Sequence, residues 1–184
     1  MKIPPILRIA LAVLILSAIL CFVGFASNVW FSVKDVLHYG LWKVCQDGGT
    51  ECQDIDDYTK FKLHSIGAVR AARACCGFGL LLVVVTGLAG PYYMARSPQQ
   101  NLVLAIASIL LIGGMMNCIG ATVYLGTKPE VLRDVKVSGS VQTMPVTVGW
   151  GAVLTVLGGV GQIATSLLVI LPVRLGKLQI DEDD

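Results

Sequence analysis

The stretch from Trp30 to Cys52 reads WFSVKDVLHYGLWKVCQDGGTEC and decides how the rest of the chain is interpreted. It holds two of the three tryptophans and a close pair of cysteines, Cys45 and Cys52, the only such pair in a polar segment. Six residues separate the two cysteines, so they can close a small hairpin loop. A disulfide there would persist only in an oxidising compartment. We therefore expect this stretch to lie outside the cytoplasm.

The composition around this stretch indicates a membrane protein. Of the 184 residues, 55% are hydrophobic and only 14% are charged, whereas soluble domains average about 25% charged residues. The mean hydropathy is +0.74. The net charge is only +2 and the basic residues form no stripe, which argues against a nucleic-acid partner.

Four apolar segments are long enough to cross a bilayer as helices. They cover about residues 6–29, 71–95, 101–125 and 148–172, and they leave polar segments at 30–70 and 126–147. We interpret residues 1–184 as a single four-span membrane domain. A cleaved signal peptide is the alternative for the first segment, because Lys2 and Arg8 are followed by an apolar run and by Gly24-Phe25-Ala26.

Short strands are predicted in both polar segments. Residues 29–33, 41–45 and 59–64 are rich in β-branched and aromatic residues, and the last of these alternates polar with apolar positions. They favour a small antiparallel sheet. Residues 135–143 carry apolar residues on either side of Ser138-Gly139-Ser140, which predicts a short hairpin.

The order of the motifs resembles the claudin superfamily, which includes claudins, epithelial membrane proteins, peripheral myelin protein and the lens fibre membrane protein. A tryptophan after the first span, a Gly-Leu-Trp triplet, two cysteines and an arginine at the head of the second span carry the resemblance. Val123–Gly126 and Gly149-Trp150 also look like that superfamily. The first group of matching residues is Trp30, Gly40, Leu41, Trp42, Cys45, Cys52 and Arg73.

The resemblance implies an all-α membrane fold, a left-handed four-helix transmembrane bundle with a small extracellular antiparallel β-sheet. Cys45 and Cys52 would pin two strands of this sheet together. Trp30 and Trp42 would seat the sheet on the bundle, and Arg73 would satisfy loop carbonyl groups.

In claudins, charged residues after the second cysteine line paracellular pores, so the resemblance makes Asp54, Asp56 and Asp57 candidate pore-lining residues. Carboxylates at a pore favour cations. The alternative is a solvated loop in which Lys60 and Lys62 are the counter-charges. The first polar segment is shorter than in a typical claudin, and the chain shown ends in Asp181-Glu-Asp-Asp184 rather than in a PDZ ligand. A tight-junction role therefore does not simply carry over.

The resemblance and the disulfide argument place the protein in the plasma membrane as a multi-pass protein, with both termini in the cytoplasm. The positive-inside rule does not support this orientation. The cytoplasmic segments would carry five Lys and Arg residues, against seven in the outer segments before Arg70 and Arg73 are counted.

No residue pattern predicts catalysis, a cofactor or a metal. Asp and Glu are absent from all four spans, which argues against a proton-coupled transporter or an intramembrane hydrolase. His38 and His64 could join the two cysteines at a zinc ion, but the spacing is not that of a zinc finger. Asn117 and Gln162 lie within spans and are interpreted as an interhelical hydrogen bond or, less simply, as a substrate contact.

Glycines in the third and fourth spans allow helix backbones to approach closely, either within one bundle or between copies of the chain. We expect a protein without enzymatic activity that acts in cell–cell contact or junction organisation, as a paracellular barrier or cation pore. The alternative is an auxiliary or trafficking subunit of a channel or receptor. The expected partners are membrane lipid and claudin-like proteins, in homotypic or heterotypic contacts.

Overall fold

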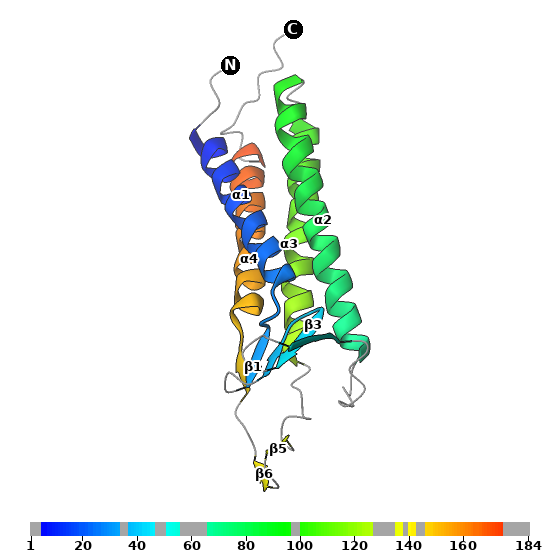
Figure 1. Cartoon of the computed structure of the whole chain (residues 1–184). Helices are drawn as coiled ribbons and strands as arrows, with labels where there is room; N and C mark the ends of the chain where they lie inside the picture. The colour runs from blue at the N-terminus through cyan, green and yellow to red at the C-terminus, as the bar shows by residue number, and fades with distance from the viewer. Residues whose placement is uncertain are drawn as a thin grey trace.

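Four long helices and a small sheet make up the computed structural model, which describes residues 5–33, 37–46, 51–55, 66–96, 100–126, 135–137, 140–142 and 146–174. The helices are α1 (Pro5–Ala26), α2 (Ile66–Arg96), α3 (Gln100–Gly126) and α4 (Trp150–Arg174). All four are long and apolar enough to cross a membrane. In Figure 1 they lie side by side, with the start of α1 and the end of α4 at the end of the bundle away from the sheet. This architecture confirms the predicted fold class.

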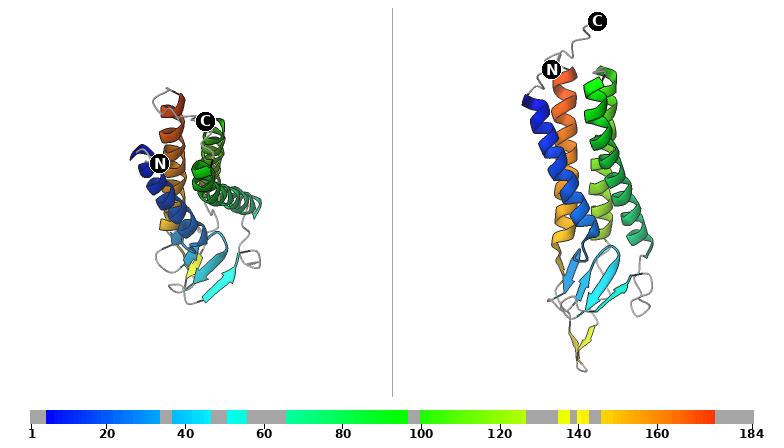
Figure 2. Two further views of the ribbon diagram at one scale, coloured as in Figure 1. Left: turned by 90° about the horizontal axis from the view of Figure 1, so that it is seen from above. Right: turned by 45° about the horizontal axis from the view of Figure 1, so that its top comes forward.

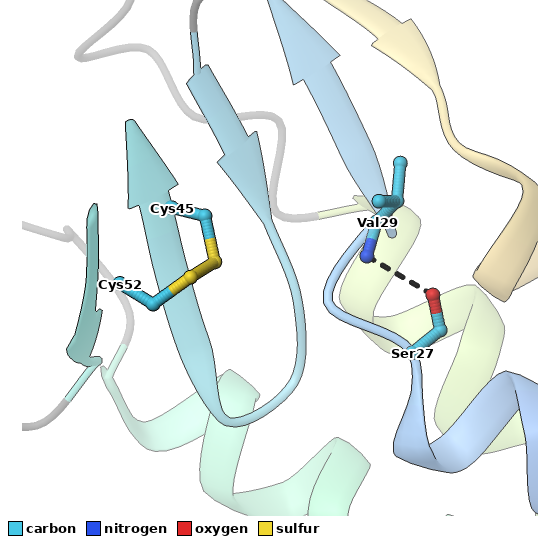
Figure 3. Close-up of a disulfide and its surroundings, with 4 residues drawn as sticks. All are labelled: Ser27, Val29, Cys45 and Cys52. Atoms are coloured by element: carbon cyan, nitrogen blue, oxygen red, sulfur yellow. Dashed lines mark hydrogen bonds between the residues drawn. A yellow bond between two sulfur atoms is a disulfide. The ribbon is translucent and has the colours of Figure 1, made fainter. Parts of the chain in front are cut away.

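At two helix ends the structure differs from the approximate predicted spans, because chain that was assigned to helix belongs to the sheet or to its connection. Helix α1 ends at Ala26, not at residue 29. The Ser27 hydroxyl accepts a hydrogen bond from the Val29 N–H at 3.0 Å, which turns the chain out of the helix (Figure 3). Helix α4 begins at Trp150, not at residue 148, because Val148 is the last residue of a strand.

Helix α2 begins five residues before the predicted start at residue 71 and continues to Arg96. At 1.5 Å per residue its 31 residues reach about 46 Å, more than the roughly 30 Å of a hydrocarbon core. The helix therefore extends beyond the hydrocarbon region. Helix α3 differs from the predicted span 101–125 by one residue at each end.

The main sheet has five antiparallel strands in the order β4-β3-β2-β1-β7. The strands are β1 (Phe31–Val33), β2 (Leu37–Tyr39), β3 (Lys43–Gln46), β4 (Glu51–Asp54) and β7 (Val146–Val148). Strands were predicted at the positions of β1 and β3, but not at those of β2, β4 and β7. The predicted strand at 59–64 lies outside the described residues.

A second, two-stranded sheet confirms the hairpin predicted at 135–143. Strands β5 (Val135–Val137) and β6 (Ser140–Gln142) pair antiparallel, with Val135 opposite Gln142. Figure 2 places this pair beyond the main sheet, on the side away from the helices.

One hydrophobic core joins the main sheet to the helix ends. Side chains alternate along β1 and β2, so that Phe31, Val33, Leu37 and Tyr39 are buried. Their intervening neighbours lie on the opposite face of the sheet. The buried face packs on residues of three helices, Ala72 and Cys76 of α2, Ala121 and Tyr124 of α3, and Ala152 of α4.

The interior of the bundle contains a polar link between helices. The Asn117 side-chain amide donates to the Gln162 side-chain oxygen at 3.2 Å, and the Gln162 amide donates to the Cys21 sulfur at 3.1 Å. The first bond confirms the predicted interhelical hydrogen bond between α3 and α4. Glycines allow the close approach that it needs, since a Cβ on Gly114 would lie 2.7 Å from the Gly159 carbonyl oxygen.

Candidate functional site

The candidate site is the main sheet together with the residues that hold it on the bundle. Five side chains link the sheet chain to the helix ends through hydrogen bonds and ring contacts or by full burial. We call them the junction cluster, namely Trp30, Leu41, Trp42, Arg73 and Tyr124. Four of them belong to the first group of motif residues identified in the sequence, and the fifth, Tyr124 of α3, belongs to the segment Val123–Gly126 that also resembles the superfamily.

Trp30 is the buried centre of the junction cluster, with no exposed surface. Its indole N–H donates to the Gly24 carbonyl oxygen at 2.8 Å, near the end of α1. The ring meets Tyr124 edge-on at a centroid distance of 5.0 Å, and Phe31 stacks on the same tyrosine at 5.3 Å. Such aromatic pairs contribute about 0.5–1.5 kcal/mol each beyond their burial. The first strand is therefore fixed to two helices at once.

Gly40 lies where the sheet chain crosses the end of α1. A Cβ at this position would lie 2.6 Å from the Asn28 Cα and 2.9 Å from the Ser27 carbonyl oxygen. Both atoms belong to backbone and cannot swing away. The Gly40 carbonyl oxygen also accepts the Tyr124 hydroxyl at 2.7 Å. The glycine of the Gly-Leu-Trp triplet is thus required by a close approach of two backbone segments.

Trp42 and Arg73 connect the sheet to α1 and α2 at a more exposed position. The Arg73 Nε–H donates to the Leu41 carbonyl oxygen at 2.7 Å, and its guanidinium lies 4.9 Å from the Trp42 ring centroid. The Trp42 indole donates to the Phe25 carbonyl oxygen at 3.2 Å, and its ring meets the Phe25 ring edge-on. Trp42 is 40% exposed, whereas Leu41 is fully buried. The two tryptophans therefore differ, one in the core and one at its rim.

The disulfide between Cys45 and Cys52 is present and joins β3 to β4 (Figure 3). The two residues are directly opposite in the strand register, and their Cα atoms are 4.0 Å apart. Strand β4 is an edge strand whose four side chains are all exposed. The bridge thus holds an edge strand that buries little surface of its own. Both sulfurs belong to the disulfide, so neither is available as a thiolate ligand for the zinc ion considered above.

The candidate pore residues are only partly described. Asp54 is exposed on β4 and lies opposite Lys43. Asp56, Asp57 and His64 lie outside the described residues. His38 lies on β2 opposite Cys45, and its buried Nδ1 has no hydrogen-bond partner within the described part of the chain.

The sequence did not reveal that the second polar segment completes the main sheet. Strand β7 pairs with β1, and Phe31 lies opposite Val148. The Gly149 N–H donates to the Trp30 carbonyl oxygen at 2.8 Å, and the Gly151 N–H donates to the Val29 carbonyl oxygen at 2.9 Å. The sequence feature that fits this pairing is Gly149, because any Cβ at this position would clash with the Val29 carbonyl oxygen.

Comparison with known proteins identifies the family of this chain. A search of curated proteins returned no significant match. A model of the PMP-22/EMP/MP20/Claudin family matches residues 5–161, which include α1, the main sheet, α2, α3 and the first part of α4. The chain therefore belongs to the PMP-22/EMP/MP20/Claudin family of membrane proteins.

Proposed function

We propose that this protein organises contacts between cells, with its main sheet as the extracellular contact surface and its termini in the cytoplasm. The family is one of membrane proteins without enzymatic activity, which favours a structural role. The disulfide supports the orientation, because it persists in an oxidising compartment. We further propose that residues 1–184 act as one membrane unit, since the sheet and three helices share a core.

The observation that carries the proposal is the contrast between the anchored part of the main sheet and its exposed edge. The sheet is fixed to the bundle next to β1 by the buried contact of Trp30 with Tyr124, while the edge strand β4 exposes all four of its side chains. A surface already held rigid loses little conformational freedom when it binds a partner. An exposed edge strand is also a ready site for pairing with another chain.

A mixed-cell assay tests the contact role. Tagged protein would be expressed in non-adherent cells, mixed with unlabelled expressing or non-expressing cells, and its density measured at cell–cell contacts. We expect enrichment at contacts between two expressing cells, and its reduction by Glu51→Lys together with Asp54→Lys on β4. Arg174→Gln, at the opposite end of the bundle, is the control and should leave enrichment unchanged. A uniform distribution over the cell surface would refute the proposal.

We propose that Asp54, with Asp56 and Asp57, favours cations if the contact forms a paracellular pore. Exposed carboxylates attract cations, and Asp54 follows the disulfide on the exposed edge strand. Replacing the three with Asn should lower the preference for sodium over chloride, measured from dilution potentials across an epithelial monolayer. Glu51→Gln removes a carboxylate from the same strand before the second cysteine, and should change the preference less. Equal effects would remove the pore assignment.

Affinity purification of the tagged protein separates the contact role from that of an auxiliary subunit of a channel or receptor. Purification in mild detergent should return the protein alone or with copies of claudin-like proteins. Recovery of a channel or receptor in constant stoichiometry would instead support an auxiliary role and contradict the contact proposal.

A further inference from the structure

The face between α1 and α2 is built differently from the other sides of the bundle. Helices α1 and α4, α4 and α3, and α3 and α2 pack extensively, whereas α1 and α2 make few contacts with each other. Figure 2 shows α1 beside α4 and α2 beside α3. Helices α1 and α2 approach each other near the sheet, where a Cβ added to Gly77 would lie 3.6 Å from the Phe25 ring. Trp42 closes this end, because it contacts both Phe25 and Arg73.

Away from the sheet, both helices continue these faces with exposed apolar side chains. On α1, residues at three- and four-residue spacing from Phe25 share its side of the helix, and on α2 the same spacing runs on from Gly77. Leu88, at 75%, is the most exposed large hydrophobic side chain described. We call this set the α1–α2 face, and its exposed members are Leu11, Ile15 and Phe22 of α1 with Leu81, Val84 and Leu88 of α2.

Exposure alone does not distinguish this face, because α4 also exposes Leu157 and Val160. Helix α4, however, has a closely packed neighbour on each side, α1 and α3. Its exposed residues therefore form a ridge that lipid chains touch from one direction. A chain lying along the α1–α2 face contacts two helices, and dispersion attraction grows with the number of contacting atoms.

A positive charge lies at the end of the α1–α2 face that is remote from the sheet. Arg8 is exposed, three residues before Leu11 on the same side of α1, and is the only charged residue of that helix. The four described helices contain no Asp or Glu that could neutralise it. An arginine at a membrane boundary extends towards the headgroups, where its guanidinium can hold a phosphate through two parallel hydrogen bonds.

We propose that the α1–α2 face holds one anionic phospholipid from the leaflet on the side of the chain ends, with its phosphate on Arg8 and an acyl chain along the exposed apolar stripes. From Arg8 to Ala18, which lies four residues before Phe22 on the same side of α1, is about 15 Å along the helix, which is half the thickness of a hydrocarbon core. One acyl chain of that leaflet thus covers the part of the face from Arg8 to Ala18. Transmembrane helices that pack on one another favour small residues at the contact, whereas the exposed members of this face are bulky.

Photo-cross-linking of lipids tests the site on the full chain. The protein would be reconstituted in phosphatidylcholine bilayers with trace phosphatidylserine or phosphatidylcholine that carries a diazirine on one acyl chain. After illumination, mass spectrometry would map the labelled residues. We expect phosphatidylserine to label the α1–α2 face about fivefold more than phosphatidylcholine does, the ratio that one basic side chain near anionic lipid supplies. Both lipids should label Leu157 and Val160 of α4 equally.

Two pairs of variants separate the charge from the shape of the face. Arg8→Gln should abolish the preference for phosphatidylserine, and Arg174→Gln, an exposed arginine at the same end of the bundle, should preserve it. Ala18→Trp should fill the face and remove its label. Leu157→Trp, which adds a side chain of the same size to the α4 ridge, is the control for this variant. If Ala18→Trp does not yield folded protein with its disulfide formed, the comparison of Arg8→Gln with Arg174→Gln still tests the proposal.

Three results would overturn the proposal. If the ratio of phosphatidylserine to phosphatidylcholine labelling is the same at the α1–α2 face and at the α4 ridge, the face makes only ordinary contact with bulk lipid. Equal effects of Arg8→Gln and Arg174→Gln would remove the phosphate contact. Protection of the face from label, accompanied by cross-links to a second chain, would show that a protein helix occupies it.

Discussion

Replacing Gly40 with alanine tests the contact between the sheet and the bundle at its tightest point. The new Cβ would lie 2.6 Å from the Asn28 Cα and 2.9 Å from the Ser27 carbonyl oxygen. Because both partners are backbone atoms, the sheet chain has to move away from the end of α1. The Tyr124 hydroxyl, which donates to the Gly40 carbonyl oxygen at 2.7 Å, would lose its geometry.

The expected loss in the free energy of unfolding follows from these two effects. Overpacking a well-packed site costs about 1–3 kcal/mol, and a lost hydrogen bond contributes about 0.5–1.5 kcal/mol. We therefore expect a loss of about 2–4 kcal/mol in the free energy of unfolding. For a chain of this size that corresponds to a fall in Tm of about 5–15 °C.

The assay is thermal unfolding of the purified protein in detergent, followed by near-ultraviolet circular dichroism of the buried aromatic residues. Gly67→Ala is the matched control, because Gly67 lies exposed in α2 and its added Cβ meets no atom within 4 Å. An exposed helical Gly→Ala change should raise stability by up to about 1 kcal/mol. If Gly40→Ala unfolds at the same temperature as the wild type, the close approach does not stabilise the junction.

Three further predictions concern the disulfide and the junction cluster. Cys45→Ser should reduce delivery to the cell surface, measured by surface biotinylation, because β4 loses its covalent link to β3. Cys75→Ser, which removes a free thiol, should be delivered normally. Equal delivery of the two variants would contradict the role of the disulfide in holding β4. Trp30→Phe should lower the free energy of unfolding by about 1–3 kcal/mol because it removes a buried hydrogen bond, and the more exposed Trp42→Phe should cost less; the reverse order in denaturant titrations would refute the assigned difference. Tyr124→Phe should cost about 1–3 kcal/mol by leaving the Gly40 carbonyl oxygen unpaired, and a stability equal to that of the wild type would show that water replaces the bond.

The helices and the disulfide could be predicted from the sequence because their signals are local. An apolar run of about 20 residues has few alternatives to a membrane helix, and Cys45 and Cys52 were the only cysteine pair outside such runs. The hydrogen bond between Asn117 and Gln162 could also be anticipated. A polar side chain within a span seeks a partner on a neighbouring helix.

The missing parts depend on tertiary contacts. Val146 and Thr147 were assigned to the second polar segment and Val148 to the fourth span, because a short apolar segment has the same pattern as a helix start or as a strand. Its pairing with β1 decides between them. The contacts of Tyr124 with Trp30 and Phe31 join residues more than 90 positions apart, and no local pattern indicates such a contact.

The central claim, that the main sheet forms an outward-facing lobe fixed to a four-span bundle, is tested most directly by the sidedness of the chain. A short epitope would be inserted between β5 and β6 in one variant, and a second variant would carry the same epitope at the C-terminus. Antibody binding would then be measured on intact and on permeabilised cells. The hairpin epitope should bind antibody on intact cells, and the C-terminal epitope only after permeabilisation. The opposite pattern, which the count of basic residues favours, would contradict the proposed orientation and with it the extracellular contact surface.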